Sequence, residues 1–435
     1  MIDPGTISAI LIGGLMLLLA IGAPVSISIA LPSALCLLLI VDFERGAITA
    51  AQQMLGGADS FALLAIPFFI LAGVIMNNGG IAERLINLAR VLVGRTPAPL
   101  VQTNVIANAI FGTVSGSAVA TAAAVGSTMA PMQRKAGYDK SFSAAANVAS
   151  APAGMLIPPS NTLIVYSLAA GGTSIGALFI AGYIPGILWA LACAAVVFVA
   201  ARRRPDLKGE PWPPFRTILV TLWRAIPSLG LIVVAIGGIV AGFFTPTEGS
   251  AIAVLYALAL SFVYRTIAVK DLPRILYDAC RTSAIVIFLI AVSTIMSYVM
   301  TYARLPQLIA ESLFGWTDSK VVVLLIMMLV LLLIGIPLDP TPAILIFTPI
   351  FLPIAVSYGV DPVHFGIMMV FNLSIAVISP PSAPVLFVGT QVAKARLEPV
   401  IVKLVPFLIV LVAMLFVIVF VPQLSLWLPG LMGLL

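Results

Sequence analysis

Charge is scarce in this chain. Only 9% of its 435 residues are Asp, Glu, Lys or Arg, whereas an ordinary soluble domain carries about 25%. Histidine occurs once, and the three cysteines, Cys36, Cys193 and Cys280, are far apart in the sequence. These side chains predict neither a disulfide framework nor a Cys/His metal site.

Several catalytic motifs are also missing. No GxxxxGK[ST] phosphate-binding loop occurs, so the chain does not use ATP by that route. No GxGD stands within an apolar run, as an intramembrane aspartyl protease would require. The single histidine, His364, stands beside Asp361 in an expected outer loop, where we place it on the surface and away from any serine nucleophile. We therefore predict that the chain is not an enzyme.

Apolar sequence is abundant instead. Hydrophobic residues make up 61% of the chain, and apolar runs of 17 or more residues recur along it. Each run is long enough to cross the ~30 Å hydrocarbon layer as a helix. The first, Ile7 to Ile21, follows Asp3 rather than positive charge and precedes no cleavage-site pattern, so we expect a retained span. The sequence predicts an all-α integral membrane protein that lies in a lipid bilayer and has no nucleic-acid partner.

The first half of the chain predicts five crossings and one hairpin. The hairpin arms are rich in amide and hydroxyl side chains, which favours a hairpin that enters and leaves the membrane on one side. Two full crossings would give the same sidedness, so that alternative stays open. The expected segments are spans at 6–21, 24–41 and 61–79, an amphipathic helix at 81–93, hairpin arms at 98–114 and 118–132, a broken helix at 141–170 and a long helix at 174–201.

Prolines, glycines and other residues that mark turns and helix ends in the first half recur 222 residues later in the second half. An odd number of crossings inverts the second copy, which is typical of secondary transporters. We expect two inverted repeats with about ten transmembrane helices, two re-entrant hairpins and two broken helices. The recurring features are Pro131 with Pro353, Gly137 with Gly359, Asp139 with Asp361, Pro158-Pro159-Ser160 with Pro380-Pro381-Ser382, and the break Ser115–Val119 with Pro337–Thr341.

Positive charge is divided unevenly under this topology. One face receives 19 of the 22 Lys and Arg residues, whereas the other keeps Arg45, Arg304 and Lys320. Because the loops of membrane proteins that face the cytoplasm carry the excess of Lys and Arg, the richer face is predicted to be cytoplasmic. The connector 202–223 then lies in the cytoplasm, and both termini lie outside it.

Acidic residues near membrane spans are informative because charge there is costly. Glu248 ends the stretch Thr245-Pro246-Thr247-Glu248, which has the pattern of a capping box, and capping is the role that we predict for it. Asp339 lies at the expected tip of the second hairpin, where its carboxylate can cap the return arm, ligate a cation, or do both.

Uncharged oxygen-bearing side chains concentrate at the breaks of the first half. Sodium suits carbonyl and hydroxyl oxygens of the kind that unwound backbone supplies. The same side chains can cap the half-helices, and the two roles are compatible. Asn372, a lone amide before the second break, makes either a helix–helix hydrogen bond or a site contact. The side chains at the first-half breaks are Ser115, Ser117, Ser160, Asn161 and Thr162.

Motifs along nearly the whole chain resemble the large membrane (permease) subunit of tripartite ATP-independent periplasmic (TRAP) transporters. They follow one another in the family's order. The motifs are Ala65–Gly73 with Asn78–Ala82, Val114–Ser117, Gly137-Tyr138, Ile157–Ser160, Thr245–Glu248, Asp339–Thr341, Asp361–Gly366 and Ser379–Pro381.

The resemblance implies a sodium-driven importer of the elevator type in the bacterial inner membrane. In such a transporter the hairpins and broken helices move against a scaffold. Sodium would be the coupling ion, with no other cofactor. The implied divisions are a first repeat at 1–201 (scaffold 1–95, transport part 96–201), a connector at 202–223 and a second repeat at 224–435 (scaffold 224–318, transport part 319–428).

The resemblance also implies partners and substrates. The partners are a small four-helix membrane subunit, expected as a separate chain, and a periplasmic protein that captures the substrate. The substrates of the family are mostly organic acids, such as C4-dicarboxylates and sialic acids. The alternative is a stand-alone sodium–dicarboxylate symporter of related architecture, which would need no capture protein.

In each half we expect the hairpin tip to meet the interrupted helix, with Ser115–Ser117 against Gly154–Asn161 and Gly335–Thr341 against Ile378–Ser382. These breaks supply two predicted sodium sites related by the repeat, with the organic acid between them. One departure concerns the second half-helix, because many family members carry Gly and Asn where this chain has Ser382-Ala383. The predicted sodium ligands are Ser115, Gly116, Ser117, Gly154, Pro158, Ser160, Asn161, Gly335, Asp339, Thr341, Ser379 and Pro380. The predicted substrate contacts are Ser117, Asn161, Thr162, Thr341, Asn372 and Ser382.

Overall fold

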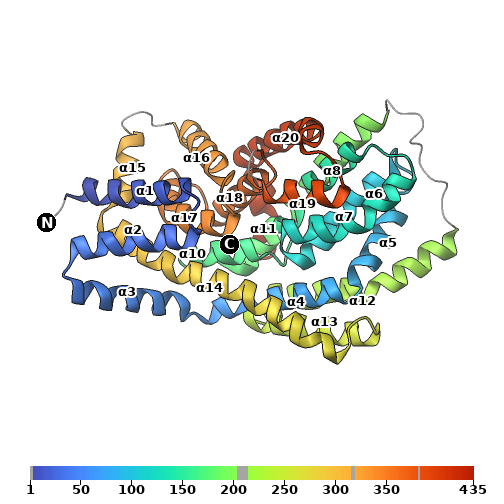
Figure 1. Ribbon diagram of the computed structural model, residues 1–435, viewed down its shortest axis with the longest axis horizontal. Coiled ribbons are helices and arrows are strands. Elements are labelled where there is room, and N and C mark those ends of the chain that lie inside the picture. The colour runs from blue at the N-terminus through green and yellow to red at the C-terminus, as the bar shows by residue number, and fades with distance from the viewer. Residues whose placement is uncertain (1–2, 203–213, 315–318, 381–382) are drawn as a thin grey trace.

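The computed structural model describes residues 3–202, 214–314, 319–380 and 383–435, and these residues form helices and no strand (Figure 1). Half of the predicted connector, residues 203–213, and the predicted substrate contact Ser382 lie outside the described residues. The first-half helices are α1 (Pro4–Ala20), α2 (Val25–Ile40), α3 (Phe43–Ala58), α4 (Ala65–Asn78), α5 (Ile81–Val93), α6 (Pro99–Ser115), α7 (Ala118–Lys135), α8 (Lys140–Ser150), α9 (Ala153–Leu156), α10 (Asn161–Ala169) and α11 (Ile175–Arg202).

The second half contributes a similar series. Each half also has one short 3₁₀ helix. In the first half η1 (Phe61–Leu64) precedes α4, and in the second half η2 (Val269–Asp271) precedes α14. The helices are α12 (Phe215–Val240), α13 (Pro246–Val263), α14 (Leu272–Tyr302), α15 (Leu305–Phe314), α16 (Lys320–Gly335), α17 (Pro340–Ser357), α18 (Pro362–Ala376), α19 (Pro384–Ala393), α20 (Leu397–Phe420) and α21 (Gln423–Leu431).

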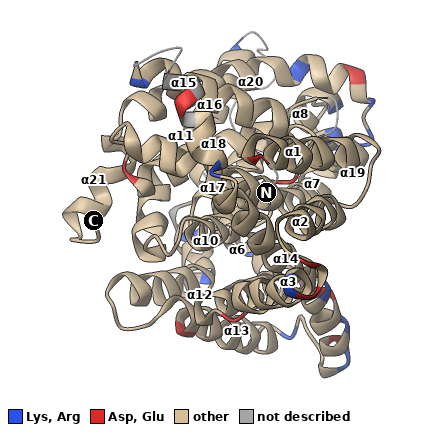
Figure 2. Cartoon of the chain, turned by 90° about the vertical axis from the view of Figure 1, so that its left-hand side faces the viewer, with Lys and Arg blue, Asp and Glu red and all other residues tan. Residues whose placement is uncertain are grey.

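The chain is a multi-pass membrane protein. Among the described residues, 7 helical segments are long and apolar enough to cross a bilayer, and several shorter apolar helices accompany them. Large apolar side chains such as Leu17, Val233 and Ile409 are more than half exposed, as expected of surfaces that face lipid. Charged residues are sparse in Figure 2, and most of them lie toward the edges of the view, at loops and helix ends.

Most first-half boundaries agree with the sequence prediction. The amphipathic helix, both hairpin arms and the long helix appear as α5, α6, α7 and α11, each within a few residues. The broken helix has a longer interruption than expected, because α8 ends at Ser150 and only the one-turn α9 precedes α10. The prediction had no counterpart for α3, which packs against α14.

The predicted surface position of His364 is wrong. Its side chain is only 2% exposed, and its Nδ1 atom lies 3.2 Å from the Ser425 hydroxyl. The reason is α21, which packs against α18 and covers this end of the helix. The sequence around Asp361 reads as a loop, but it is the N-cap of α18, where the carboxylate accepts hydrogen bonds from the backbone N–H groups of residues 363 and 364.

Corresponding helices of the two halves share boundaries and contacts. The arm α7 spans residues 118–135 and the arm α17 spans residues 340–357, which is a shift of 222 at both ends. The half-helix α10 packs against α17, and the half-helix α19 packs against α7. The half-helix of each half therefore contacts the return arm of the other half. The halves also meet where the rings of Trp189 in α11 and Phe371 in α18 lie 4.8 Å apart.

Candidate functional site

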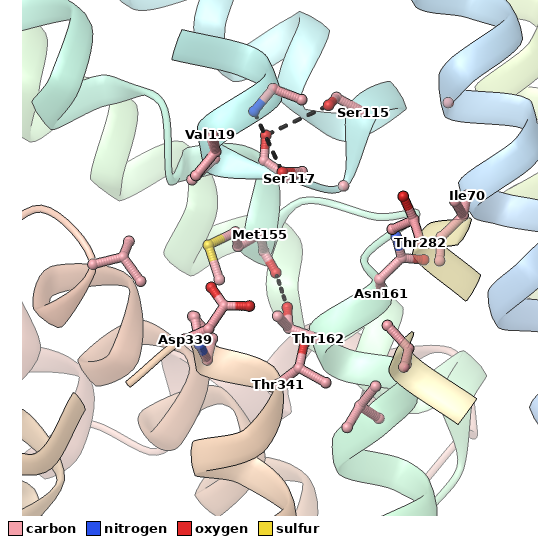
Figure 3. Close-up of a pocket in the computed structure, with 18 of the residues that line it drawn as sticks. Ile70, Ser115, Ser117, Val119, Met155, Asn161, Thr162, Thr282, Asp339 and Thr341 are labelled. Atoms are coloured by element: carbon pink, nitrogen blue, oxygen red, sulfur yellow. Dashed lines mark hydrogen bonds between the residues drawn. The ribbon is translucent and has the colours of Figure 1, made fainter. Parts of the chain in front are cut away.

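A cavity of about 300 Å³ lies where the two hairpin tips and the two half-helices meet. The tips contribute Ser115 to Ala120 and Asp339 to Thr341, and the half-helix α10 contributes Asn161 and Thr162. Figure 3 shows these segments around the cavity, with α4 and α14 along another side. The cavity thus has walls from both halves of the chain.

Four helices begin at this cavity. Its lining includes the first residues of α7, α10, α17 and α19, namely Ala118, Asn161, Pro340 and Pro384. The N-terminus of a helix carries a partial positive charge and unpaired N–H groups, so it favours anions. Four such termini favour negative charge at this cavity, although none of the described residues that line it is basic.

The first hairpin tip turns at Gly116, which has φ +60° and caps α6. A Cβ atom added there would lie 3.0 Å from the Asn161 side-chain nitrogen, so the tip sits directly on the start of α10. The next residue, Ser117, is the N-cap of α7, and its hydroxyl accepts a hydrogen bond from the Ala120 N–H at 3.4 Å. One turn back along α6, Gly112 touches the backbone of Gly154. The predicted meeting of these two breaks is confirmed.

One carbonyl group accepts two side-chain hydrogen bonds in the interruption before α10. The Met155 carbonyl oxygen accepts hydrogen bonds from the hydroxyl groups of Ser160 and Thr162, the latter at 3.0 Å (Figure 3). The two hydroxyl oxygens lie 2.8 Å apart, and Ser160 also caps α10 through the Leu163 N–H. These oxygens form a compact polar group in an otherwise apolar part of the protein.

Asp339 is the only charged residue among the described residues that line the cavity. Its side chain is exposed because it faces the cavity. It is the N-cap residue of α17, but its carboxylate accepts no N-cap hydrogen bond from the described backbone. The sequence left two roles open for Asp339, capping the return arm and ligating a cation. The carboxylate does not cap α17 in this structure, so its oxygens are available to a cation.

The second hairpin also meets its own half's break. A Cβ atom added to Gly335, at the end of α16, would lie 2.7 Å from the Ala376 Cβ at the end of α18. Val377, Pro384 and Val385, on either side of that break, line the same cavity as Asp339.

The predicted site residues separate into two groups. Those that line the cavity are Ser115, Gly116, Ser117, Asn161, Thr162, Asp339 and Thr341. Those that do not line it and are buried or half-buried are Gly154, Pro158, Ser160, Gly335, Ser379 and Pro380.

Asn372 lies outside the cavity. Its side chain is fully buried, and its amide nitrogen donates a hydrogen bond to the Met328 carbonyl oxygen of α16 at 2.7 Å. The structure therefore places it in a helix–helix contact, one of the two roles left open by the sequence, and not among the residues that a substrate in this cavity would touch.

Sequence reasoning missed the wall formed by α4 and α14. Asn77 and Thr282 are its polar members, and Gly73 also lines the cavity. Nothing in the local sequence marks these residues, because a lone amide or hydroxyl in a span is common. Only the packing of α14 against α4 and α17 brings them to the site.

The cavity is lined by several oxygen-bearing side chains. In the described part of the chain no group of three or more His, Cys, Asp or Glu residues could hold a metal ion. The oxygens present are hydroxyl, amide, carbonyl and one carboxylate, which suit a hard monovalent cation. Glu248 takes no part, since it forms the predicted capping box with Thr245 at the start of α13.

Comparison with known proteins bears on this arrangement. A family model described as "Tripartite ATP-independent periplasmic transporter, DctM component" matches residues 12–424. The chain belongs to this family. It is 51% identical to the protein YgiK of Salmonella typhimurium, described as uncharacterized, over 97% of each chain. It is 36% identical to the C4-dicarboxylate TRAP transporter large permease protein DctM of Rhodobacter capsulatus, over 98% of this chain and 100% of that one.

Solved structures with a similar fold are also transporters. The YdaH transporter of Alcanivorax borkumensis superimposes with a TM-score of 0.57 at 16% identity, over 86% of this chain and 88% of that one. At this identity the likeness concerns the fold alone. The predicted resemblance to TRAP large subunits is confirmed, and the family consists of transporter permeases rather than enzymes.

Proposed function

We propose that this TRAP large subunit imports an organic acid across the bacterial inner membrane, driven by sodium and by an elevator movement. The observation that carries the proposal is the cavity at which four helices begin. A carboxylate there is favoured by the helix N-termini. The relative named for C4-dicarboxylates makes a carboxylate the first substrate class to test.

Sodium coupling explains how an anion is accepted beside Asp339. Two negative groups a few ångströms apart repel each other, and a bound cation removes that cost. The Asp339 carboxylate, the Met155 carbonyl group and the hydroxyl groups around it are the ligands at hand. Sodium binding would therefore precede or accompany substrate binding, with one site in each half.

The shared helix boundaries support two inverted repeats. The hairpins and interrupted helices, with the cavity among them, would form the transport part. They would slide along a scaffold that includes α4 and α14, which line the cavity without contributing a break. The charge distribution supports a cytoplasmic connector and periplasmic termini.

Family membership supports two partners. A small membrane subunit would pack against the scaffold, and a periplasmic protein would deliver the substrate. The chain alone, reconstituted into liposomes, should then move little substrate. Uptake should appear when both partners and an inward sodium gradient are supplied.

The experiment is uptake of labelled C4-dicarboxylates and sialic acid, with sodium replaced by potassium as the control. Uptake that needs both sodium and the capture protein supports the proposal. Robust uptake by the isolated chain would instead support the stand-alone symporter, and uptake that is equal in potassium would exclude sodium coupling.

A further inference from the structure

A second cavity, of about 700 Å³, lies where α12 crosses α5. It is separate from the cavity between the two hairpin tips and shares none of that cavity's lining residues. We call it the arginine groove. Its basic residues are Arg84, Arg90 and Arg224, its acidic residue is Glu83, and its neutral polar residues are Asn87, Thr217, Thr221 and Thr266.

Two helix faces build this groove from regular spacings. On α12, residues 217, 221 and 224 are one and two turns apart, so their side chains share a face. On α5, residues 83, 87 and 90 do the same, while the opposite face of that helix is buried. The groove is therefore a consequence of the amphipathic pattern of α5 and of where α12 packs on it.

Arg84 is held in place by an aromatic ring. Its guanidinium carbon lies 3.5 Å from the centroid of the Tyr264 ring, a cation–π contact that orients the guanidinium plane. An oriented guanidinium group presents paired N–H donors, which match two oxygens of one phosphate. Arg224, from the other wall, adds a second exposed positive charge.

Apolar side chains accompany the basic ones at the groove. Val91 of α5 lines it. On α12, Val220 shares the helix face of Thr217 and Arg224 and is 42% exposed, and Trp223, the neighbour of Arg224 in the sequence, is 74% exposed. Such a surface in a membrane protein faces acyl chains, and an exposed tryptophan next to an arginine is typical of headgroup depth. A ligand with both a phosphate and an apolar tail matches both surfaces.

We propose that the arginine groove binds the phosphate headgroup of an anionic phospholipid. The headgroup would lie between Arg84 and Arg224, with its acyl chains over Val91 and Val220. Because α5 leads directly into the first hairpin arm α6, a bound lipid would stabilise the contact between this helix and α12. This inference does not depend on the proposed transport function.

The test measures thermal unfolding of the purified chain in a neutral detergent, with added phosphatidylglycerol or with phosphatidylcholine of the same acyl chains. The wild type should gain a midpoint shift from phosphatidylglycerol and much less from phosphatidylcholine. The Arg224→Gln variant should lose at least half of that shift. Arg216→Gln is the matched control, because it removes the same charge from the same helix but does not line the groove.

Two further measurements identify the ligand. Native mass spectrometry should find phosphatidylglycerol retained by the wild type and by Arg216→Gln, and lost from Arg224→Gln, whatever the stability of the variants. Inorganic phosphate at millimolar concentration should not reproduce the shift. An equal response of both variants would overturn the site, and a full response to phosphate alone would overturn the lipid as its ligand.

Discussion

The two hairpins have corresponding boundaries but different interiors. In the first, amide side chains join the arms α6 and α7 to α8. The Asn147 side chain accepts hydrogen bonds from Asn104 and Asn108, at 2.8 and 3.1 Å, and donates one to the Ala122 carbonyl oxygen. Gln133 adds a hydrogen bond to Asn104. The first hairpin is therefore held by a buried polar network.

In the second hairpin the equivalent positions are apolar. Asn104, Asn108 and Asn147 correspond, 222 residues later, to Ile326, Val330 and Met369. The amide network is replaced by side chains that fill space without directional bonds. Hydrogen bonds fix one register of the packed helices, whereas apolar packing tolerates small sliding movements. We therefore expect the first hairpin to be the more rigid of the two.

The tips differ in the same way. Ser117 corresponds to Asp339, and each stands just before a return arm. The serine makes its N-cap hydrogen bond, whereas the aspartate makes none and turns its carboxylate to the cavity. The N-cap of the first tip is thus made within the protein, whereas the Asp339 carboxylate makes no N-cap hydrogen bond with the described backbone.

The largest expected effect concerns the backbone contact of the first hairpin. In the Gly154→Ala variant the new methyl group would overlap the Gly112 backbone, which cannot give way as a side chain can. We expect a loss of about 3 kcal/mol in the free energy of unfolding. Denaturant unfolding in detergent measures it. The control is Ala376→Gly at the equivalent position, expected to cost about 1 kcal/mol; equal losses would contradict a tighter first hairpin.

The second prediction tests the polar network. Asn147→Leu leaves the amide groups of Asn104 and Asn108 without their shared acceptor, and we expect a cost of about 2 kcal/mol. Met369→Leu, at the equivalent position of the second hairpin, conserves volume and should cost less than about 1 kcal/mol. The same unfolding assay compares the two. A cost at residue 369 as large as that at residue 147 would remove the distinction between the hairpins.

The third prediction sharpens the difference at the tips. Asp339→Asn removes the charge that faces the cavity, so the sodium concentration for half-maximal uptake should rise about tenfold, equivalent to 1.4 kcal/mol. Uptake by the full three-component system measures it. Glu248→Gln is the control, because it makes the same chemical change at a helix N-terminus away from the cavity. An unaltered sodium dependence in Asp339→Asn would argue against a cation at this tip.

The smallest effect is expected at the other tip. Ser117→Ala removes the N-cap of α7 and should lower the free energy of unfolding by about 1 kcal/mol. Its sodium dependence should change less than threefold, because the surrounding carbonyl oxygens remain. A sodium shift as large as that of Asp339→Asn would show that both tips bind the ion through their side chains.

Much of the helical framework could be predicted from the sequence. Apolar runs specify spans because a bilayer leaves the backbone no partner but itself. Proline and glycine specify where helices stop, which is why α5 and both arms of the first hairpin were placed within a few residues. The helix α3 was missed because its pattern is mixed, with Glu44, Arg45 and two glutamines among its apolar residues.

The candidate site could be predicted only in part. Ser115–Ser117, Asn161 and Asp339 are marked by the breaks in which they stand, and the structure brings them to one cavity. Asn77 and Thr282 carry no such mark and depend on helix packing. For Asn372 the sequence left a helix–helix hydrogen bond and a site contact both open, and the structure shows the hydrogen bond, to the Met328 carbonyl oxygen of α16.

The sequence by itself determined the membrane class, the positions of the breaks and the kinds of oxygen available at them, because these depend on local chemistry and spacing. The tertiary structure alone decided which residues bring the breaks together, since no local rule specifies that Gly116 touches Asn161 or that Gly112 touches Gly154. It also decided that Asp339 is uncapped while Ser117 is capped. Both outcomes depend on the rotation and depth of whole helices, which are set by packing across the entire molecule.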